Sequence, residues 1–396
     1  MQEHPKDKPG FIRSLKRELQ YYRNSGRECL LAVIILSASM IIVAWIFSSG
    51  TLTNLPIAVI DNDASSVSRT YIRMLNASPE MHIVDKLTST TEGRELLEQG
   101  SIYALVLIPE GFGKDIKKAK QTTILAWHSG QYLTISGTIL KSLRLITASM
   151  SAGVEMTSLA KRGASGLAAS VQFSPLQTEL RTLFNPFQNY QYFLVASLLP
   201  AMLQVFVMVW TVFVIGKEFR DQTSVEWLAS GGSIYCTLAA KVLPVFMLAS
   251  MIGIACLIWL FGIAGWPVTG SLTLLVVGWE LMICAYIVLG LLFVALTKVL
   301  ATALSLTVFF TAPAFAYAGI TFPQHSMPLM AQLWTYLLPI KTLLRLQIEQ
   351  AEIGAPVSSS MAEILTLLCF ILLPLPFAIG RIRRRNETIR IGANCG

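Results

Sequence analysis

Motifs for catalysis are missing from this chain of 396 residues, which has only four histidines. It contains no Gly-x-x-x-x-Gly-Lys-Ser/Thr loop for nucleotide phosphates, because Gly113-Lys114 is followed by Asp115 and lacks the upstream glycine. The Gly-x-Ser-x-Gly elbow of serine hydrolases and the His-Glu-x-x-His pair of zinc proteases are missing as well. We therefore expect no catalytic residues in this polypeptide and no cofactor bound by it.

Cysteine is also scarce, and none of the six cysteines falls within residues 51–185. That hydrophilic block must fold on its own apolar core, since neither a disulfide framework nor a cysteine metal cluster is available. Asp61 and Asp63 lie two positions apart in a stretch typical of a turn. Two carboxylates with no third ligand nearby are more typical of a helix start than of a metal site, so we expect no metal.

Charged residues make up 14% of the chain, and four long stretches have none: 29–60, 182–216, 242–279 and 299–340. A helix needs about 20 apolar residues to cross the hydrocarbon core. We therefore expect a polytopic α-helical membrane protein with six transmembrane helices. The expected apolar spans are residues 30–47, 192–215, 243–263, 272–296, 300–319 and 364–380. The first span is too long for the core of a secretory signal, and we expect it to be retained.

Lysine and arginine concentrate on one side of these spans. They lie in the N-terminal arm (Lys6, Lys8, Arg13, Lys16, Arg17, Arg23, Arg27), between the second and third spans (Lys217, Arg220, Lys241), at Lys298, and in the tail (Arg381, Arg383, Arg384, Arg385, Arg390). The loops on the other side have few, because 262–270 has none and 321–361 has only Lys341 and Arg345. The positive-inside rule then predicts that both termini are cytoplasmic. The net charge of +8 is mostly this topology signal, and we expect no nucleic acid as a partner.

The block between the first two spans is predicted to be a mixed α/β extracytoplasmic domain. Its strand-like apolar runs are residues 55–60, 81–84, 103–108 and 122–127, which alternate with helical stretches. From Ile139 onward apolar residues recur every three or four positions, which predicts a long amphipathic helix that packs on its own domain. A partner-binding helix is the alternative. Residues 163–170 are rich in glycine, alanine and serine and are expected to form a flexible link to the membrane.

Two segments on the cytoplasmic side are distinctive. Residues 1–28 carry an apolar stripe beside basic residues, the pattern of an amphipathic helix on the inner membrane surface. The stripe consists of Phe11, Ile12, Leu15, Leu19 and Tyr22. Residues 217–228 follow the second span, with charges at one end and Val225, Trp227 and Leu228 at the other. Such a short helix could dock onto a cytoplasmic partner, although composition alone favours a solvated loop.

Several short motifs, specific in their order and spacing together, carry a family resemblance that bears on this segment. They are Leu55-Pro56-Ile57-Ala58-Val59-Ile60-Asp61, then Ala104 to Ile108 with Pro109 and Gly111-Phe112, Asn185-Pro186, Asn189-Tyr190, Glu218 with Thr223 and Glu226-Trp227-Leu228, Gly319-Ile320-Thr321-Phe322-Pro323, Ser326-Met327-Pro328 and Pro339. Through them nearly the whole chain resembles the permease subunits of type-2 ABC exporters, in the subgroup with a large external domain between spans 1 and 2. The chain departs from that family at Ala196-Ser197, where Pro-Gly is frequent, and at Gln222, where glycine often precedes the threonine.

The resemblance implies a coupling helix at 217–230 that an ATP-binding subunit receives and the N-terminal amphipathic helix supports. The residues implicated in ATPase coupling are Lys217, Glu218, Arg220, Thr223, Glu226, Trp227 and Leu228. It also implies two copies of an ABC ATPase, which bind the ATP, and a second permease, identical or homologous, in the inner membrane of a bacterium. Membrane lipid is a further expected partner, and a periplasmic adaptor protein is an additional candidate.

These expectations divide the chain into five parts. They are the cytoplasmic interface helix 1–28, the first transmembrane helix 29–50, the extracytoplasmic domain 51–185, transmembrane helices two to six in 186–380, and the basic cytoplasmic tail 381–396. Residues 325–340 are apolar but short and bounded by prolines, which favours a re-entrant segment. A seventh crossing is the alternative, but it would place the arginine-rich tail outside.

Glu280 lies well inside the fourth span, where an ionisable group costs about 2.5–3.5 kcal/mol. Such a group normally faces protein or water. We regard Glu280 as a candidate for the translocation pathway. The alternative, slightly favoured because an ATP-driven exporter needs no proton relay, is a structural group that is hydrogen-bonded to a neighbouring helix.

We therefore expect the chain to be a transport subunit that exports small hydrophobic or amphipathic compounds, drugs included, and is powered by a separate ATPase. Envelope lipids or glycans are the next substrate class for such an exporter. The second hypothesis is a non-transporting membrane receptor or scaffold that uses its external domain to bind a partner. An ion-coupled secondary transporter is disfavoured by the external insert and the lone buried carboxylate.

Overall fold

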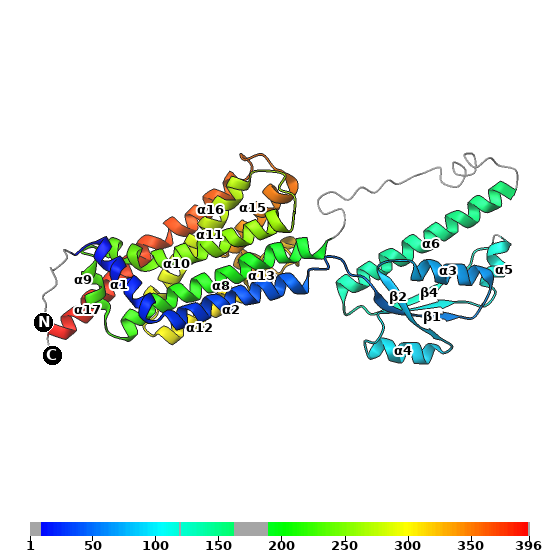
Figure 1. Cartoon of the computed structure of the whole chain (residues 1–396), viewed down its shortest axis with the longest axis horizontal. Helices are drawn as coiled ribbons and strands as arrows, with labels where there is room; N and C mark the ends of the chain where they lie inside the picture. The colour runs from blue at the N-terminus through cyan, green and yellow to red at the C-terminus, as the bar shows by residue number, and fades with distance from the viewer. Residues whose placement is uncertain (1–8, 119, 162–188, 395–396) are drawn as a thin grey trace. The chain divides into compact units, whose positions relative to one another are not determined.

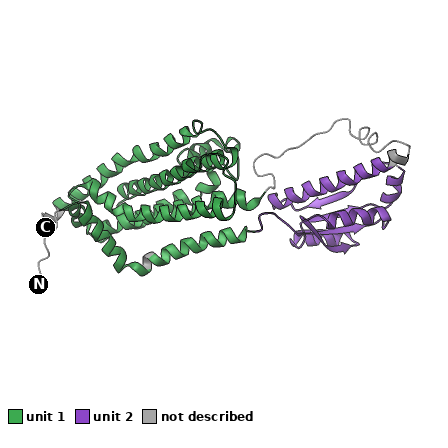
Figure 2. Ribbon diagram, turned by 45° about the horizontal axis from the view of Figure 1, so that its top comes forward, with its two compact units in different colours: residues 1–48, 183–396 green, residues 49–182 purple. Residues whose placement is uncertain are grey.

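The computed structural model describes residues 9–118, 120–161 and 189–394 (Figure 1). The chain divides into two compact units (Figure 2): unit 1 comprises Met1–Ser48 and Leu183–Gly396, and unit 2 comprises Ser49–Thr182. The expected link at 163–170 and the motif Asn185-Pro186 lie outside the described residues.

Unit 1 is helical. Its elements are α1 (Phe11–Asn24), α2 (Gly26–Ile46), α8 (Tyr190–Arg220), α9 (Ser224–Ser230), α10 (Ile234–Leu257) with a π-helical continuation (Ile258–Ile263), α11 (Leu272–Leu296), α12 (Leu300–Thr311), α13 (Ala314–Tyr317), a 3₁₀ turn (Gln324–Ser326), α14 (Leu329–Thr335), α15 (Pro339–Gln347) with a π-helical turn (Ile348–Ile353), α16 (Met361–Leu372) and α17 (Pro374–Asn394). The long helices run side by side, and α1, α9 and the C-terminal part of α17 gather at one end of the unit (Figure 1).

Long apolar helices confirm a multi-pass membrane architecture. Among the described residues, five helices are long and apolar enough to cross a membrane: Tyr190–Arg220, Ile234–Ile263, Leu272–Leu296, Leu300–Tyr317 and Met361–Ile391. The first predicted span lies in α2, whose apolar part, Leu30–Ile46, is shorter. The count of six crossings stays a prediction.

Helix α11 lies at the centre of unit 1, where it contacts α8, α10, α15, α16 and α17. Trp279, Met282 and Tyr286 on this helix are buried, as expected of a helix that is apolar on every side. A Cβ atom at Gly290 would lie 3.1 Å from Cβ of Thr211 on α8. Glycine therefore permits the close approach of these two helices, the role that small residues play where membrane helices cross.

After α12 the chain continues in short helices. Residues 325–340 contain α14, and Pro339 begins α15. At the end of α15, the buried amide of Gln347 donates to the carbonyl of Ala196 on α8 (2.9 Å) and accepts from the indole N–H of Trp279 on α11 (3.3 Å). This buried amide joins α15 to α8 and α11. Re-entry of 325–340 into the membrane stays a prediction.

Unit 2 has the predicted mixed α/β fold. Its elements are β1 (Leu55–Asp61), α3 (Ser66–Asn76), β2 (Met81–Leu87), α4 (Thr90–Glu98), β3 (Ala104–Ile108), α5 (Phe112–Lys117), β4 (Leu125–His128) and α6 (Leu133–Lys161). The sheet order is β2-β1-β3-β4; β1 is parallel to β2 and β3, whereas β4 is antiparallel to β3.

The two faces of the sheet are covered by different helices (Figure 1). Ile57 and Val59 of β1 pack with residues of α3 and α6, whereas Ala58 and Ile60 pack with Leu96 and Leu97 of α4. This alternation follows from the two-residue period of a strand. Helix α6 packs on its own domain, as predicted, with Ile139 and Leu143 buried in the same core.

The turn after β1 uses its two carboxylates as hydrogen-bond acceptors. Asp61 accepts from the backbone N–H groups of Asp63 and Ala64, and Asp63 accepts from the backbone N–H of Gly113 (2.9 Å). Ser65 caps α3 by accepting from two backbone N–H groups of its first turn. In the described part of the chain no group of three or more histidine, cysteine, aspartate or glutamate side chains could hold a metal ion.

Candidate functional site

The segment expected to contain a coupling helix consists of the end of α8, a tight turn and α9. Helix α8 ends at Arg220, and Gln222 has a φ of 60°, in the left-handed region that favours glycine. Thr223 precedes α9, and its hydroxyl donates to the carboxylate of Glu218. The turn therefore reverses the chain and ties the start of α9 back to α8.

The seven predicted coupling residues differ in exposure. Arg220 and Glu226 are exposed, Lys217, Thr223 and Leu228 are half-buried, and Glu218 and Trp227 are buried. The Trp227 ring packs edge-on against Phe219, with 6.3 Å between the ring centres. Arg220 and Glu226 can thus meet a partner directly, whereas Glu218 and Trp227 hold α9 on unit 1.

Glu218 belongs to a group of four charges, called here the Lys241 cluster, in which Glu18 of α1, Glu218 of α8 and Lys241 of α10 are buried and Arg17 of α1 is half-buried. The ammonium of Lys241 lies 2.8 Å from Oε2 of Glu18 and 2.6 Å from Oε1 of Glu218. The guanidinium of Arg17 lies 2.9 Å from Oε2 of Glu218. The cluster therefore joins three helices through Lys241 and Glu218.

The charges of the cluster cancel, since two are positive and two are negative. The side chain of Lys241 is 4% exposed and that of Glu18 is 2% exposed, so water screens their interaction little. Burial raises the pKa of Glu18, and the nearby Lys241 ammonium opposes this shift. Removal of one partner from such a buried pair costs about 3–5 kcal/mol, because the other charge is left uncompensated.

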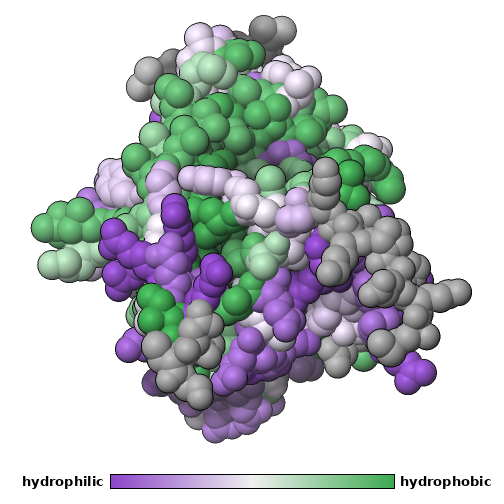
Figure 3. All heavy atoms as spheres, turned by 90° about the vertical axis from the view of Figure 1, so that its left-hand side faces the viewer, coloured by the Kyte–Doolittle hydropathy of each residue, from purple (hydrophilic) through white to green (hydrophobic). Residues whose placement is uncertain are grey.

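Helix α1 packs on the other helices of unit 1 through a face that includes polar side chains. Ser14 and Glu18 are buried, whereas Ile12 and Leu19 of the predicted apolar stripe are exposed. Tyr21 continues the contact, because its hydroxyl accepts from the ammonium of Lys217 (2.9 Å). Figure 3 looks onto this end, where hydrophilic side chains gather beside the apolar flank of the helices.

Lys241 lies within α10, which begins at Ile234, as Lys217 and Arg220 lie within α8. Its carboxylate partners, Glu18 and Glu218, neutralise its charge. The expected position of Lys241 between the second and third spans stays a prediction.

Glu280 lies on α11, half-buried, and accepts a hydrogen bond from the hydroxyl of Ser250 on α10. Its carboxylate thus has a partner on a neighbouring helix. It is not joined to the Lys241 cluster by any interaction found among the described residues.

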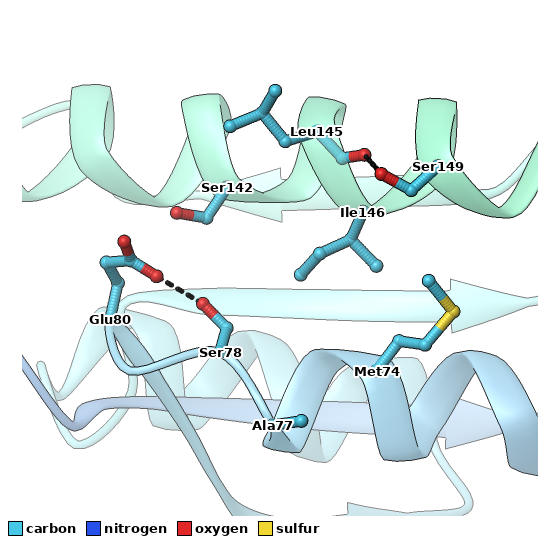
Figure 4. A pocket seen from close by; sticks show the side chains of 8 residues that line it. All are labelled: Met74, Ala77, Ser78, Glu80, Ser142, Leu145, Ile146 and Ser149. Atoms are coloured by element: carbon cyan, nitrogen blue, oxygen red, sulfur yellow. Dashed lines mark hydrogen bonds between the residues drawn. The ribbon is translucent and has the colours of Figure 1, made fainter.

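Two hollows occur in the structure away from these residues. One of about 380 Å³ lies between α3 and α6 of unit 2 (Figure 4) and is lined by Met74, Ala77, Ser78, Glu80, Ser142, Leu145, Ile146 and Ser149. The other, of about 310 Å³, lies in unit 1 and is lined by Ala318, Gly319, Ile320, Gln324, Lys341, Arg345, Ile348, Glu349 and Ile353. None of the predicted site residues lines either hollow.

The bundle of long apolar helices is that of a multi-pass membrane protein. A model of the family described as "ABC-2 family transporter protein" matches residues 29–379. The chain belongs to this family of transporter permeases. Membership implies an ABC ATPase as a partner.

Part of the chain is similar to the linearmycin resistance permease protein LnrN of Bacillus subtilis (strain 168). It is 26% identical over 98 residues, which cover 24% of this chain. The matched part spans 25% of that relative's length.

Proposed function

We propose that this chain is the membrane-spanning subunit of an ATP-driven exporter, with α9 as the helix that a separate ABC ATPase receives. The observation that carries the proposal is the exposure of Glu226 on α9, a helix that the buried Trp227 anchors, and of Arg220 at the end of α8 beside it. In this arrangement six helices cross the bacterial inner membrane, both termini and α9 are cytoplasmic, and unit 2 is outside. A second permease, identical or homologous, completes the transporter with two ATPase copies.

In the proposed mechanism, closure of the ATPases on ATP pushes on α9. Trp227 and the bond from Thr223 to Glu218 resist displacement of α9 against α8, so the push is passed to α8 and α10. Packed helices move as rigid bodies rather than deforming continuously. The two permeases then switch between arrangements that face opposite sides of the membrane.

The proposed substrates are small hydrophobic or amphipathic compounds, drugs included. The name of the Bacillus subtilis relative, a resistance permease, supports this class. Export of envelope lipid or glycan would use the same coupling helix and is distinguished by the transported molecule alone.

Co-purification with the ATPase tests the coupling assignment. The wild-type chain, solubilised in mild detergent, should bring down an ABC ATPase, and Glu226→Lys should weaken that association because it reverses an exposed charge on α9. Glu92→Lys is the matched control, since Glu92 is likewise an exposed acid in the first turn of a helix, but in unit 2. Equal recovery of the ATPase with wild type and Glu226→Lys would contradict the assignment.

Cysteine labelling in intact cells tests the orientation. In a cysteine-free background, a cysteine introduced at Lys86 of unit 2 should react with a reagent that does not cross the membrane. A cysteine at Arg384 should stay protected until the cells are opened. The reverse pattern would overturn the proposed topology.

A further inference from the structure

The Lys241 cluster connects parts of the chain that are remote in sequence. Arg17 and Glu218 are 201 positions apart, and their charged groups lie 2.9 Å from each other. Lys241 lies between Glu18 of α1 and Glu218 of α8, and Glu218 in turn accepts from Thr223 at the start of α9. A continuous path of charge-assisted hydrogen bonds therefore runs from α1 to α9.

Other contacts between α1 and α9 are weaker. The backbone N–H of Gly10, at the start of α1, donates to the carbonyl of Ser230 at the end of α9 (3.1 Å). The hydroxyl groups of Ser14 on α1 and Ser224 on α9 are buried, but neither makes a hydrogen bond. These two groups therefore add nothing to the attachment, and the charge cluster is the strong link between the two helices.

Burial of the three charges of Glu18, Glu218 and Lys241 is a poor way to gain stability, because well-packed apolar side chains of similar volume stabilise as well or better. The geometry instead fixes the position of α1, since the ammonium of Lys241 on α10 bonds to one carboxylate on α1 and to one on α8. Apolar contacts alone would let α1 slide along the bundle end.

We propose that the Lys241 cluster is a clamp that makes α1 and α9 move as one body when the ATPase pushes on α9. Glu18, Glu218 and Lys241 are then positioning residues, which act through α9 rather than on the transported compound. The clamp rests on the function proposed above, because it needs an ATPase that binds α9. Helix α1 thereby enlarges the body that receives the push.

The clamp is tested by a distance measurement in the complete complex of permease and co-purified ATPase. Spin labels are placed at Gln20 on α1 and Ala229 on α9, which are both exposed. Pulsed electron paramagnetic resonance then compares the nucleotide-free complex with the complex trapped with ATP and vanadate. In the wild-type clamp, the distance between the labels should stay the same in both states.

Two variants weaken the clamp, and both keep the net charge of the cluster at zero. Arg17→Gln combined with Glu18→Gln removes both ion pairs that α1 makes in the cluster and leaves the pair of Lys241 and Glu218 in place. Lys241→Met combined with Glu18→Gln removes the ion pair between α1 and Lys241 but leaves that of Arg17 with Glu218, so its thermal stability should be close to wild type. Lys298→Met, at an exposed lysine of the same end, is the control.

In both clamp variants the distance should broaden or shift on ATP binding, while the ATPase still co-purifies. ATP hydrolysis that depends on the permease should fall about fivefold or more, the usual size of coupling between sites. The clamp is overturned if the wild-type distance changes with ATP, or if the variants keep a constant distance and wild-type hydrolysis. A wild-type chain that recovers no ATPase would instead overturn the proposed function.

Discussion

The guanidinium group of Arg385 stacks on the ring of Phe219, with 4.0 Å between its central carbon and the ring centre. Its nitrogens also donate to the carbonyl groups of Val294 (3.2 Å), Thr297 (2.8 Å) and Lys298 (2.8 Å). These carbonyls lie at the C-terminal end of α11, where helix carbonyls lack partners and favour a cation. One tail arginine thus joins α17 to α11 and to the end of α8.

Arg385→Lys should lower the stability of unit 1 by about 2 kcal/mol, because a lysine cannot make the forked set of bonds or stack on Phe219. Thermal unfolding of the purified chain in detergent measures the change. Arg384→Lys is the matched control, since Arg384 is the preceding residue and its exposed side chain should tolerate the exchange. An equal effect of the two substitutions would show that only charge matters here.

Gln222→Gly should raise stability by about 1 kcal/mol, because the φ of 60° is strained for a residue with a side chain. The same exchange at Asp221, whose φ is −85°, should bring no gain. If both variants melt at the wild-type temperature, the turn is not strained.

Gly113→Ala should destabilise unit 2 by about 1–3 kcal/mol through overpacking. A Cβ atom at this position would lie 2.4 Å from Oγ of Ser65 and 3.1 Å from Oδ2 of Asp63. Gly137→Ala, on α6, is the control, since an added Cβ there meets nothing within 4 Å. Hydrogen exchange of the full-length chain would report faster exchange in β1 and α3 for Gly113→Ala only.

The stability of unit 2 should fall in acid through Asp63. Burial would raise the pKa of this carboxyl, but hydrogen bonds from Ser65 and from the backbone N–H groups of Gly113 and Gly111 outweigh burial and lower the pKa. A lowered pKa means that the ionised form stabilises the fold above the ordinary value of 3.8, and that this contribution is lost as the pH falls further.

Hydrogen exchange of β1 and α3 as a function of pH measures this effect. Asp63→Asn should be less stable than wild type near neutral pH and should show a flatter dependence below the ordinary pKa of the carboxyl. Parallel curves for the two proteins would mean that Asp63 does not contribute to the acid response.

The positions of the long helices could be predicted from the sequence, whereas the contacts of the candidate site could not. Hydropathy is a local property, so charge-free runs located α8 and α12, and the apolar run around Glu280 located α11. The pairing of Lys241 with Glu18 depends on how α1 packs against α10, and no nearby residue pattern specifies that arrangement. The apolar stripe of α1 concerns the predicted membrane surface, and it gives no information on Ser14 and Glu18, the residues that are buried against the bundle.

The hydrogen bond that Glu280 accepts from Ser250 favours a structural role for Glu280 over a role in the translocation pathway. Glu280→Gln keeps an oxygen that can accept from Ser250 and should unfold at the wild-type temperature. Glu280→Ala and Ser250→Ala should each cost about 1 kcal/mol, the size of hydrogen bonds between membrane helices. Because the two residues share one bond, the double variant should cost about as much as either single variant. Additive losses would mean that the bond contributes little, and loss of transport in a stable Glu280→Gln variant would place the charge itself in the translocation pathway.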